Sequence, residues 1–121
     1  MNIVMIYPRY PATFWSFTYA LKYLSCKAAF PPLGLLTVAA MLPKTWQIRL
    51  IDLNIHPLRD TDLLEADYVM ISAMLIQRDS VSDVLNACRR LGIKTLACGP
   101  LFSALSDEFV ENVDHLILGE A

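Results

Sequence analysis

Residues 66–100 read ADYVMISAMLIQRDSVSDVLNACRRLGIKTLACGP, and this stretch decides the fold. Two short apolar runs, residues 68–72 and 93–98, are typical of buried strands. Between them, apolar side chains recur at helical spacing until Gly92, which predicts the end of a helix. Ser80 and Asp83 have the spacing of a capping box and predict that this helix begins near Ser80. A strand, a helix and a strand of these lengths predict a parallel pair with a crossover.

The same alternation continues on both sides of this unit. Further strands are predicted over residues 2–7, 46–53 and 113–118, and helices over residues 31–42 and 61–66, with another capped near Ser103 or Ser106. The helix over residues 31–42 is apolar nearly all round, which predicts that it is buried. We therefore expect one α/β domain over residues 1–121, a Rossmann-like, flavodoxin-like doubly wound parallel sheet of five strands in the order 2-1-3-4-5.

The composition fits a sheet that is covered on both faces. The 121 residues are 55% hydrophobic and 18% charged, and the net charge of −2 gives no reason to expect nucleic acid. No apolar run approaches the roughly 20 residues needed to span a bilayer, and no secretory signal opens the chain, so we expect a cytoplasmic protein. The three cysteines lack metal-ligand spacing, so no metal site is predicted.

The motifs of several enzyme classes are absent from this sequence. There is no GxGxxG and no GxxxxGK[ST], so an ordinary dinucleotide site and a P-loop are not expected. Ile71 and Ser72 stand where a receiver domain needs its phospho-acceptor aspartate. Neither His56 nor His115 pairs with an obvious nucleophile. No catalytic residue is therefore predicted in this chain.

Small and turn-forming residues follow four of the predicted strands. They are Tyr7-Pro8, Ser72-Ala73-Met74, Cys98-Gly99-Pro100 and Gly119-Glu120-Ala121. Ligands of open parallel sheets bind outside the carboxyl ends of the strands, and small residues let a large flat ligand approach the backbone. The sequence therefore predicts a cofactor site at this edge. The segment 8–31 is long for a connection and rich in aromatic residues, which predicts a functional loop or a small helix of its own.

Five segments carry a resemblance to a known family. PPLGLL (31–36), IDLN (51–54), ADYVMIS (66–72), CGP (98–100) and VDHLILGEA (113–121) resemble, in order, the N-terminal cobalamin-binding domain of radical S-adenosylmethionine enzymes. The resemblance covers nearly the whole chain. It implies a domain that holds cobalamin over the strand ends and a C-terminal barrel of the same chain carrying a [4Fe-4S] cluster and S-adenosylmethionine. The barrel's CxxxCxxC motif is absent here, so the resemblance implies a fragment of a longer chain. Reactions typical of the family are methylations, which implies a methyltransferase acting on a small-molecule or lipid-like substrate.

The resemblance also implies roles for individual residues. Ser72, Ala73 and Met74 would line the pocket for the nucleotide tail, while Gly99, Pro100 and Leu101 would approach the dimethylbenzimidazole. Gly119 and Glu120 would close that side. The loop up to Phe17 would face the corrin from below through Tyr7, Pro8, Arg9, Tyr10, Thr13, Phe14 and Trp15.

Two departures from related domains matter. The loop after the first strand holds no histidine where methionine-synthase-type domains carry DxHxxG, so we expect cobalamin bound without a protein imidazole on cobalt. Cys98 stands where glycine is usual. Two other interpretations stay open: a non-catalytic regulatory or interaction module with residues 10–23 as a docking surface, and a Rossmann-type nucleotide enzyme, which the first loop disfavours.

Overall fold

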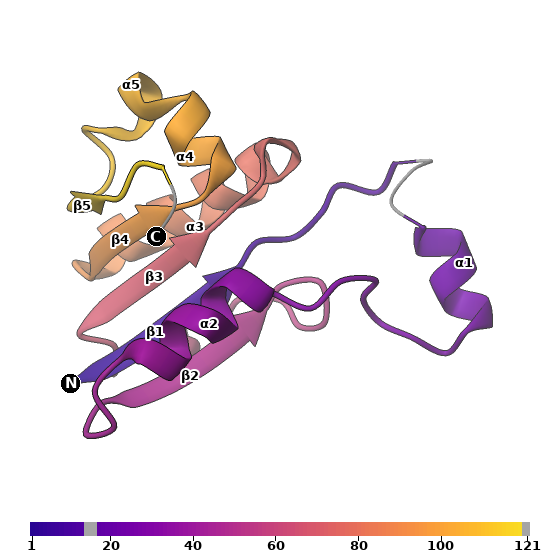
Figure 1. Ribbon diagram of the computed structural model, residues 1–121, viewed down its shortest axis with the longest axis horizontal. Helices are drawn as coiled ribbons and strands as arrows, with labels where there is room; N and C mark the ends of the chain where they lie inside the picture. Colours follow the sequence, from indigo (N-terminus) through magenta and orange to yellow (C-terminus); the bar gives the residue numbers. More distant parts are fainter. Residues whose placement is uncertain (14–16, 120–121) are drawn as a thin grey trace.

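A five-stranded parallel sheet forms the centre of the computed structural model, which describes residues 1–13 and 17–119 (Figure 1). The strands are β1 (Asn2–Tyr7), β2 (Gln47–Asp52), β3 (Tyr68–Ser72), β4 (Lys94–Cys98) and β5 (His115–Leu116). They lie in the order β2-β1-β3-β4-β5, and every pairing is parallel. This confirms the predicted flavodoxin-like α/β fold.

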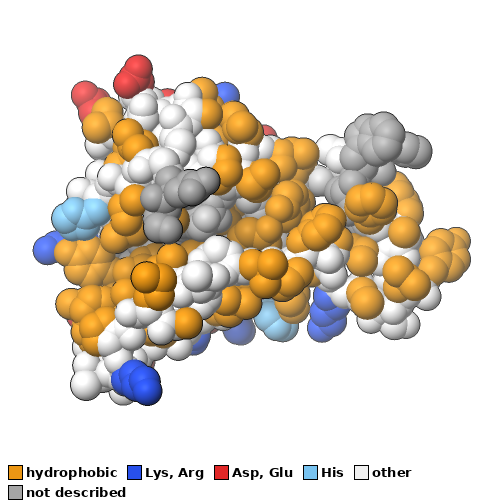
Figure 2. Space-filling view, in the orientation of Figure 1, with side chains coloured by type: hydrophobic (Ala, Val, Ile, Leu, Met, Phe, Trp, Pro, Cys, Tyr) orange, Lys and Arg blue, Asp and Glu red, His pale blue; other side chains and the backbone are white. Residues whose placement is uncertain are grey.

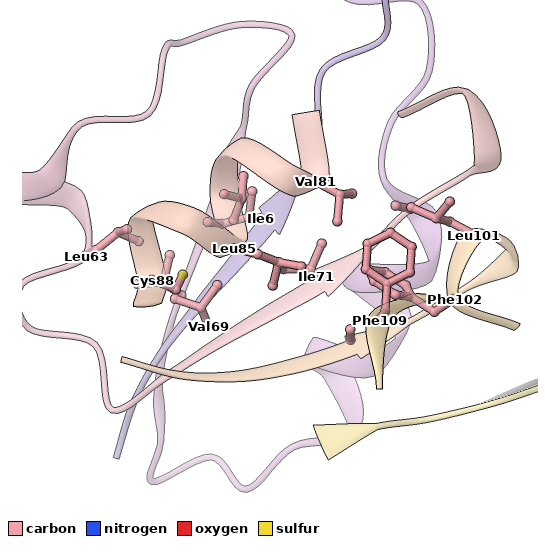
Figure 3. Close-up of a cluster of buried hydrophobic side chains, with 14 residues drawn as sticks. Ile6, Leu63, Val69, Ile71, Val81, Leu85, Cys88, Leu101, Phe102 and Phe109 are labelled. Atoms are coloured by element: carbon pink, nitrogen blue, oxygen red, sulfur yellow. The ribbon is translucent and has the colours of Figure 1, made fainter. Parts of the chain in front are cut away.

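Alternating side chains of the strands divide the core between the two faces of the sheet. Val4 and Ile6 of β1 lie in the larger cluster, whereas Ile3 and Met5 of the same strand lie in the smaller one. The larger cluster packs under α3 (Arg78–Leu91), α4 (Pro100–Ala104) and α5 (Ser106–Phe109), as Figure 3 shows. The smaller cluster packs under α2 (Leu33–Met41), which lies across the near face in Figure 1.

Helix α3 packs through the side chains predicted from its periodicity. Val81, Val84, Leu85 and Cys88 are at most 5% exposed, and Gly92 ends the helix with a φ of 68°. The predicted start at Ser80 is wrong, because the helix begins at Arg78 and Ser80 lies within its first turn. The helix extends further because the short 3₁₀ helix η3 (Leu75–Gln77) leads directly into it.

Helix α2 does not have the predicted burial. It forms close to where it was expected, but Leu35 is the only buried residue within it. One stripe packs on the sheet, since Leu35, Val38 and Ala39 contact the smaller cluster, while Leu33 and Met41 are 66% and 79% exposed. The prediction is wrong because the helix packs on the sheet through one side alone, and its apolar composition does not distinguish that side from the other.

Three further differences concern short elements. The helix expected over residues 61–66 is a 3₁₀ turn, η2 (Asp60–Asp62), and β5 spans two of the six residues predicted. The single helix expected after β4 is divided into α4 and α5, with Asp107 in the first turn of α5. The long segment 8–31 after β1, called the arm below, carries a small helix, α1 (Thr18–Tyr23), which stands away from the sheet (Figure 1). None of the described helices has the length and apolar character required to span a membrane.

Candidate cofactor site at the carboxyl edge of the sheet

The loop after β1 is fixed by side chains from three other parts of the chain. The carbonyl oxygen of Pro8 accepts hydrogen bonds from Gln77 Nε2 at 2.5 Å and from Asn54 Nδ2 at 3.2 Å. The Tyr10 amide donates to Asn54 Oδ1 at 2.9 Å, and the Arg9 amide donates to Ser80 Oγ at 2.9 Å. Residues 8–10 therefore have a defined path across the strand ends.

Gln77 connects the loop after β1 to the loop after β3. Its side chain is 1% exposed, and besides binding Pro8 it accepts a hydrogen bond from the Met74 amide at 2.8 Å. The Gln77 amide in turn donates to the Met74 carbonyl at 2.9 Å. One buried amide group thus satisfies backbone groups of both loops and sets their spacing.

The loops after β3 and β4 pack directly on each other. The Ala73 amide donates to the Cys98 carbonyl at 3.3 Å, and the Leu101 amide donates to the Ala73 carbonyl at 3.0 Å. Gly99 has a φ of 100°, and a Cβ there would lie 3.0 Å from both Ser72 Oγ and the Ala73 carbonyl oxygen. The contact between these loops therefore requires glycine at this position.

Two aromatic rings stand beside the end of β1. The hydroxyls of Tyr7 and Tyr10 are 2.7 Å apart, and the rings meet edge to face with centroids 5.9 Å apart. Burial raises the pKa of Tyr7 above its usual range, and the hydrogen bond to Tyr10 adds a smaller contribution in the same direction. The phenol of Tyr7 therefore stays neutral at physiological pH. The nearby Asp52 accepts a hydrogen bond from the Asn54 amide at 2.8 Å, as aspartate side chains often do in turns.

The structure brings most of the sequence-predicted residues to one edge, in different settings. Met74 is 47% exposed and forms an apolar shelf with Leu75 and Ile76, at 53% and 52%. Ala73 and Leu101 are 2% and 0% exposed, so a ligand could reach them only through their backbone. Pro8 is also buried, whereas Arg9 and Pro100 are exposed. Gly119 donates its amide to Ser103 Oγ at 3.0 Å. The predicted contacts at Phe14, Trp15 and Glu120 lie outside the described residues.

A cleft of about 750 Å³ opens between the arm and α3. Its lining includes Arg9, Tyr10 and Thr13 from the predicted loop, and Asn54 and Ser80, which were not predicted as site residues. Asn54 and Ser80 also hold the backbone of that loop, but through contacts that are distant in sequence. Asn54 lies within the IDLN motif quoted above, so the sequence offered a reason to predict it as a site residue. No local sequence pattern pointed to Gln77.

Cys98 lies at the end of β4, next to Ser72. Burial raises the pKa of its thiol, a shift only partly opposed by the hydrogen bond with Ser72. The thiol is therefore neutral near pH 7, and its half-buried sulfur lies close to the Ile71 carbonyl oxygen at 3.6 Å. The side chain is packed against β3, so it contributes an uncharged group to this edge.

Comparison with known proteins relates this chain to methyltransferases. It is 37% identical over 122 residues to an uncharacterized methyltransferase of Synechocystis and 36% identical over 120 residues to the hopanoid C-2 methylase of Rhodopseudomonas palustris. These alignments include 99% and 98% of this chain but only 23% of each relative. No family model and no solved structure matches the chain. The chain is thus similar to one region of larger proteins that are named as methyltransferases.

Proposed function

We propose that this chain is the cobalamin-binding domain of a longer radical S-adenosylmethionine methyltransferase. The observation that carries the proposal is the edge where the loops after β1, β3 and β4 are tied together, because the family-like motifs ADYVMIS and CGP end there. The similarity to a hopanoid C-2 methylase supports the methyltransferase part. A [4Fe-4S] cluster and S-adenosylmethionine would belong to the region of the parent protein outside these 121 residues.

The residues at this edge fit a large, flat and mostly apolar ligand. The exposed shelf at Met74, Leu75 and Ile76 offers apolar surface, and the packed loop at Gly99 adds backbone without a side chain. Buried ligands of this kind gain mostly from apolar contact, with a few polar groups to orient them. The hydroxyls of Tyr7 and Tyr10 are polar groups of that kind.

The chain would bind and orient the cofactor and would not contribute an imidazole from the loop after β1. Cobalamin, when bound, supplies a cobalt-carried methyl group for transfer. The tyrosine pair would exclude water beside the strand ends, and the neutral phenol of Tyr7 at pH 7 suits an apolar environment. The hydrogen bonds of Gln77 and Asn54 would hold the loop in place before the ligand arrives, which lowers the ordering cost of binding.

An anaerobic titration of the full-length protein with hydroxocobalamin, followed by the visible spectrum in dim light, tests the proposal. We expect saturable binding with a base-off spectrum. Met74→Glu changes an exposed side chain of the shelf and should weaken binding without unfolding the domain, because it places a charge against an apolar ligand. Val110→Glu, at a residue 57% exposed after α5, is the matched control and should bind as the unchanged protein does.

A second pair of variants tests the nucleotide-tail pocket. Ser72→Tyr places a bulky side chain at the end of β3 and should weaken binding, whereas Ser82→Tyr, at an exposed position of α3, should not. Circular dichroism of each variant checks that the sheet is intact. If the folded full-length protein does not bind cobalamin, the cobalamin assignment fails. The interaction module would then be the better account, supported by exposed side chains of the arm such as Tyr23, at 91%.

A further inference from the structure

The outer face of α2 is apolar and exposed. Six of its residues are exposed, and they recur at the spacing of one side of a helix: Leu33, Gly34, Leu36, Thr37, Ala40 and Met41. Leu33, Leu36 and Met41 are 66%, 44% and 79% exposed. A helix that faces water normally carries charged or polar side chains there, so this face has the composition of a buried surface.

Only one side chain on this face of α2 is polar. Thr37 is the only residue of the helix with a hydrogen-bonding side chain, and its Oγ1 already donates to the Leu33 carbonyl at 2.9 Å. Gly34 has no atom within 4 Å of where a Cβ would stand, so the backbone is open to close approach by another helix. No charged residue occurs between Ala28 and Pro43. Small and apolar residues at these positions are what helix–helix packing uses.

The sheet is covered unequally by the described helices. Helices α3, α4 and α5 lie over the larger cluster, while α2 is the only described helix over the smaller cluster, on the near face of the sheet (Figure 1). Leu96 of β4 is half-buried at the margin of the smaller cluster, and Ile117 beyond β5 is 39% exposed. Figure 2 shows this face as mostly hydrophobic, with few charged side chains over α2.

We propose that the outer face of α2 is an internal interface, packed in the parent protein against the polypeptide that follows residue 121. The inference rests on the proposed function in two respects: it takes this chain as one domain of a longer protein, and it places the barrel of that protein after residue 121. The relatives support that view, because this chain aligns with 23% of each. Covering this face would remove three large apolar side chains from water, which is favourable and is a reason for such a face to be buried.

A membrane surface is a poorer match for this face. Helices that lie on a bilayer combine an apolar side with a polar, usually basic, side. Helix α2 has neither a polar side nor a basic residue, and its inner stripe is occupied by the sheet. A protein partner that buries the outer stripe fits the composition of the whole helix.

Hydroxyl-radical footprinting of the full-length protein, read by mass spectrometry, tests this inference without altering the chain. Met41 is 79% exposed in this domain, and its oxidation rate should fall about tenfold if it becomes as buried as ordinary core residues. Leu36 should be protected in the same direction. Leu64 and Val110, at 66% and 57%, lie outside this face and should stay reactive. The measurement is made without cobalamin, at several protein concentrations, and with and without anionic vesicles.

Each outcome of the footprint decides the matter. Protection of Met41 and Leu36 at every concentration and without vesicles supports the inference, even if cobalamin fails to bind and the proposed function falls. Reactivity equal to that of Leu64 and Val110 overturns it, even if cobalamin binds. Protection that needs high protein concentration would overturn it in favour of a second copy, and protection that needs vesicles would overturn it in favour of a membrane.

A matched pair of variants gives an independent readout in the full-length protein. Leu36→Glu should lower the urea midpoint of unfolding, since a carboxylate would enter the interface. Leu64→Glu makes the same change at a more exposed leucine and should leave the midpoint unchanged. Equal midpoints for the two variants would contradict the inference.

Discussion

Gln77→Leu should destabilise the domain by about 2 kcal/mol, because it removes the buried amide that joins two loops. The change keeps the size of the side chain but deletes the bond from Nε2 to the Pro8 carbonyl and the bond from the Met74 amide to Oε1. A net loss of about 1 kcal/mol per hydrogen bond gives this figure. The expected loss of stability is no larger than this for two reasons. Asn54 still donates a hydrogen bond to the Pro8 carbonyl, and Met74 is half-exposed, so water can reach the Met74 amide.

Urea unfolding of residues 1–121, followed by circular dichroism, measures this change. Gln47→Leu, at an exposed position of the edge strand β2, is the control and should alter the free energy of unfolding by less than about 0.5 kcal/mol. Gln77→Glu should be more harmful near pH 7 than near pH 4, because burial opposes the charged carboxylate while the neutral acid can donate to Pro8. The reasoning is refuted if Gln77→Leu and Gln47→Leu have the same stability.

Three further changes follow from single sites. Gly99→Ala should destabilise the domain by about 1–3 kcal/mol, since the backbone there has a φ of 100° and no room for a Cβ. Gly34→Ala, on the open face of α2, should be neutral or stabilising by up to about 1 kcal/mol. Urea unfolding of both variants separates backbone strain from helix propensity. The hydrogen bond from the Thr95 amide is the main reason that the pKa of Asp114 is lowered. Its contribution to stability is therefore present above the usual carboxyl pKa and is lost as the pH falls through the lowered value. Asp114→Asn should cost more stability at pH 7 than near pH 3, measured by thermal unfolding at both values. Burial raises the pKa of Cys88 to about 11, so maleimide should label exposed Cys26 rapidly and Cys88 only on unfolding, and rapid labelling of both in the folded chain would contradict the packing of α3.

The strands were predictable because their signal is local. Residues 2–7 and 68–72 are apolar runs bounded by turn-forming residues, and both strands have the predicted bounds. The sheet order follows from the alternation of strands and helices, since few parallel arrangements are compatible with it. Cys88 on the buried side of α3 and the cap at Asp52 are also consequences of short-range spacing.

The site network was less predictable because its contacts join residues that are distant in sequence. Ser80 matched a capping pattern, but its hydroxyl binds the amide of Arg9, 71 residues away. Gln77 has no distinguishing neighbours, and its role depends on Pro8, 69 residues earlier. Only the fold brings these groups together. The need for glycine at position 99 also comes from another loop, because Ser72 and Ala73 lie too close to leave room for a side chain there.

The apolar composition has two physical origins in this chain. A mean hydropathy of +0.43 suits strands that are buried on both faces, and the fully buried side chains of β1 and β3 account for part of it. Another part lies outside the core, since Tyr23, Leu24, Leu33 and Met41 are each at least 66% exposed. If these side chains stayed in contact with water, polar replacements would make the domain more soluble. If they were buried, the domain would be more stable. Their exposure on α2 is what the interface proposed above would explain, since a neighbouring part of a larger protein would bury them.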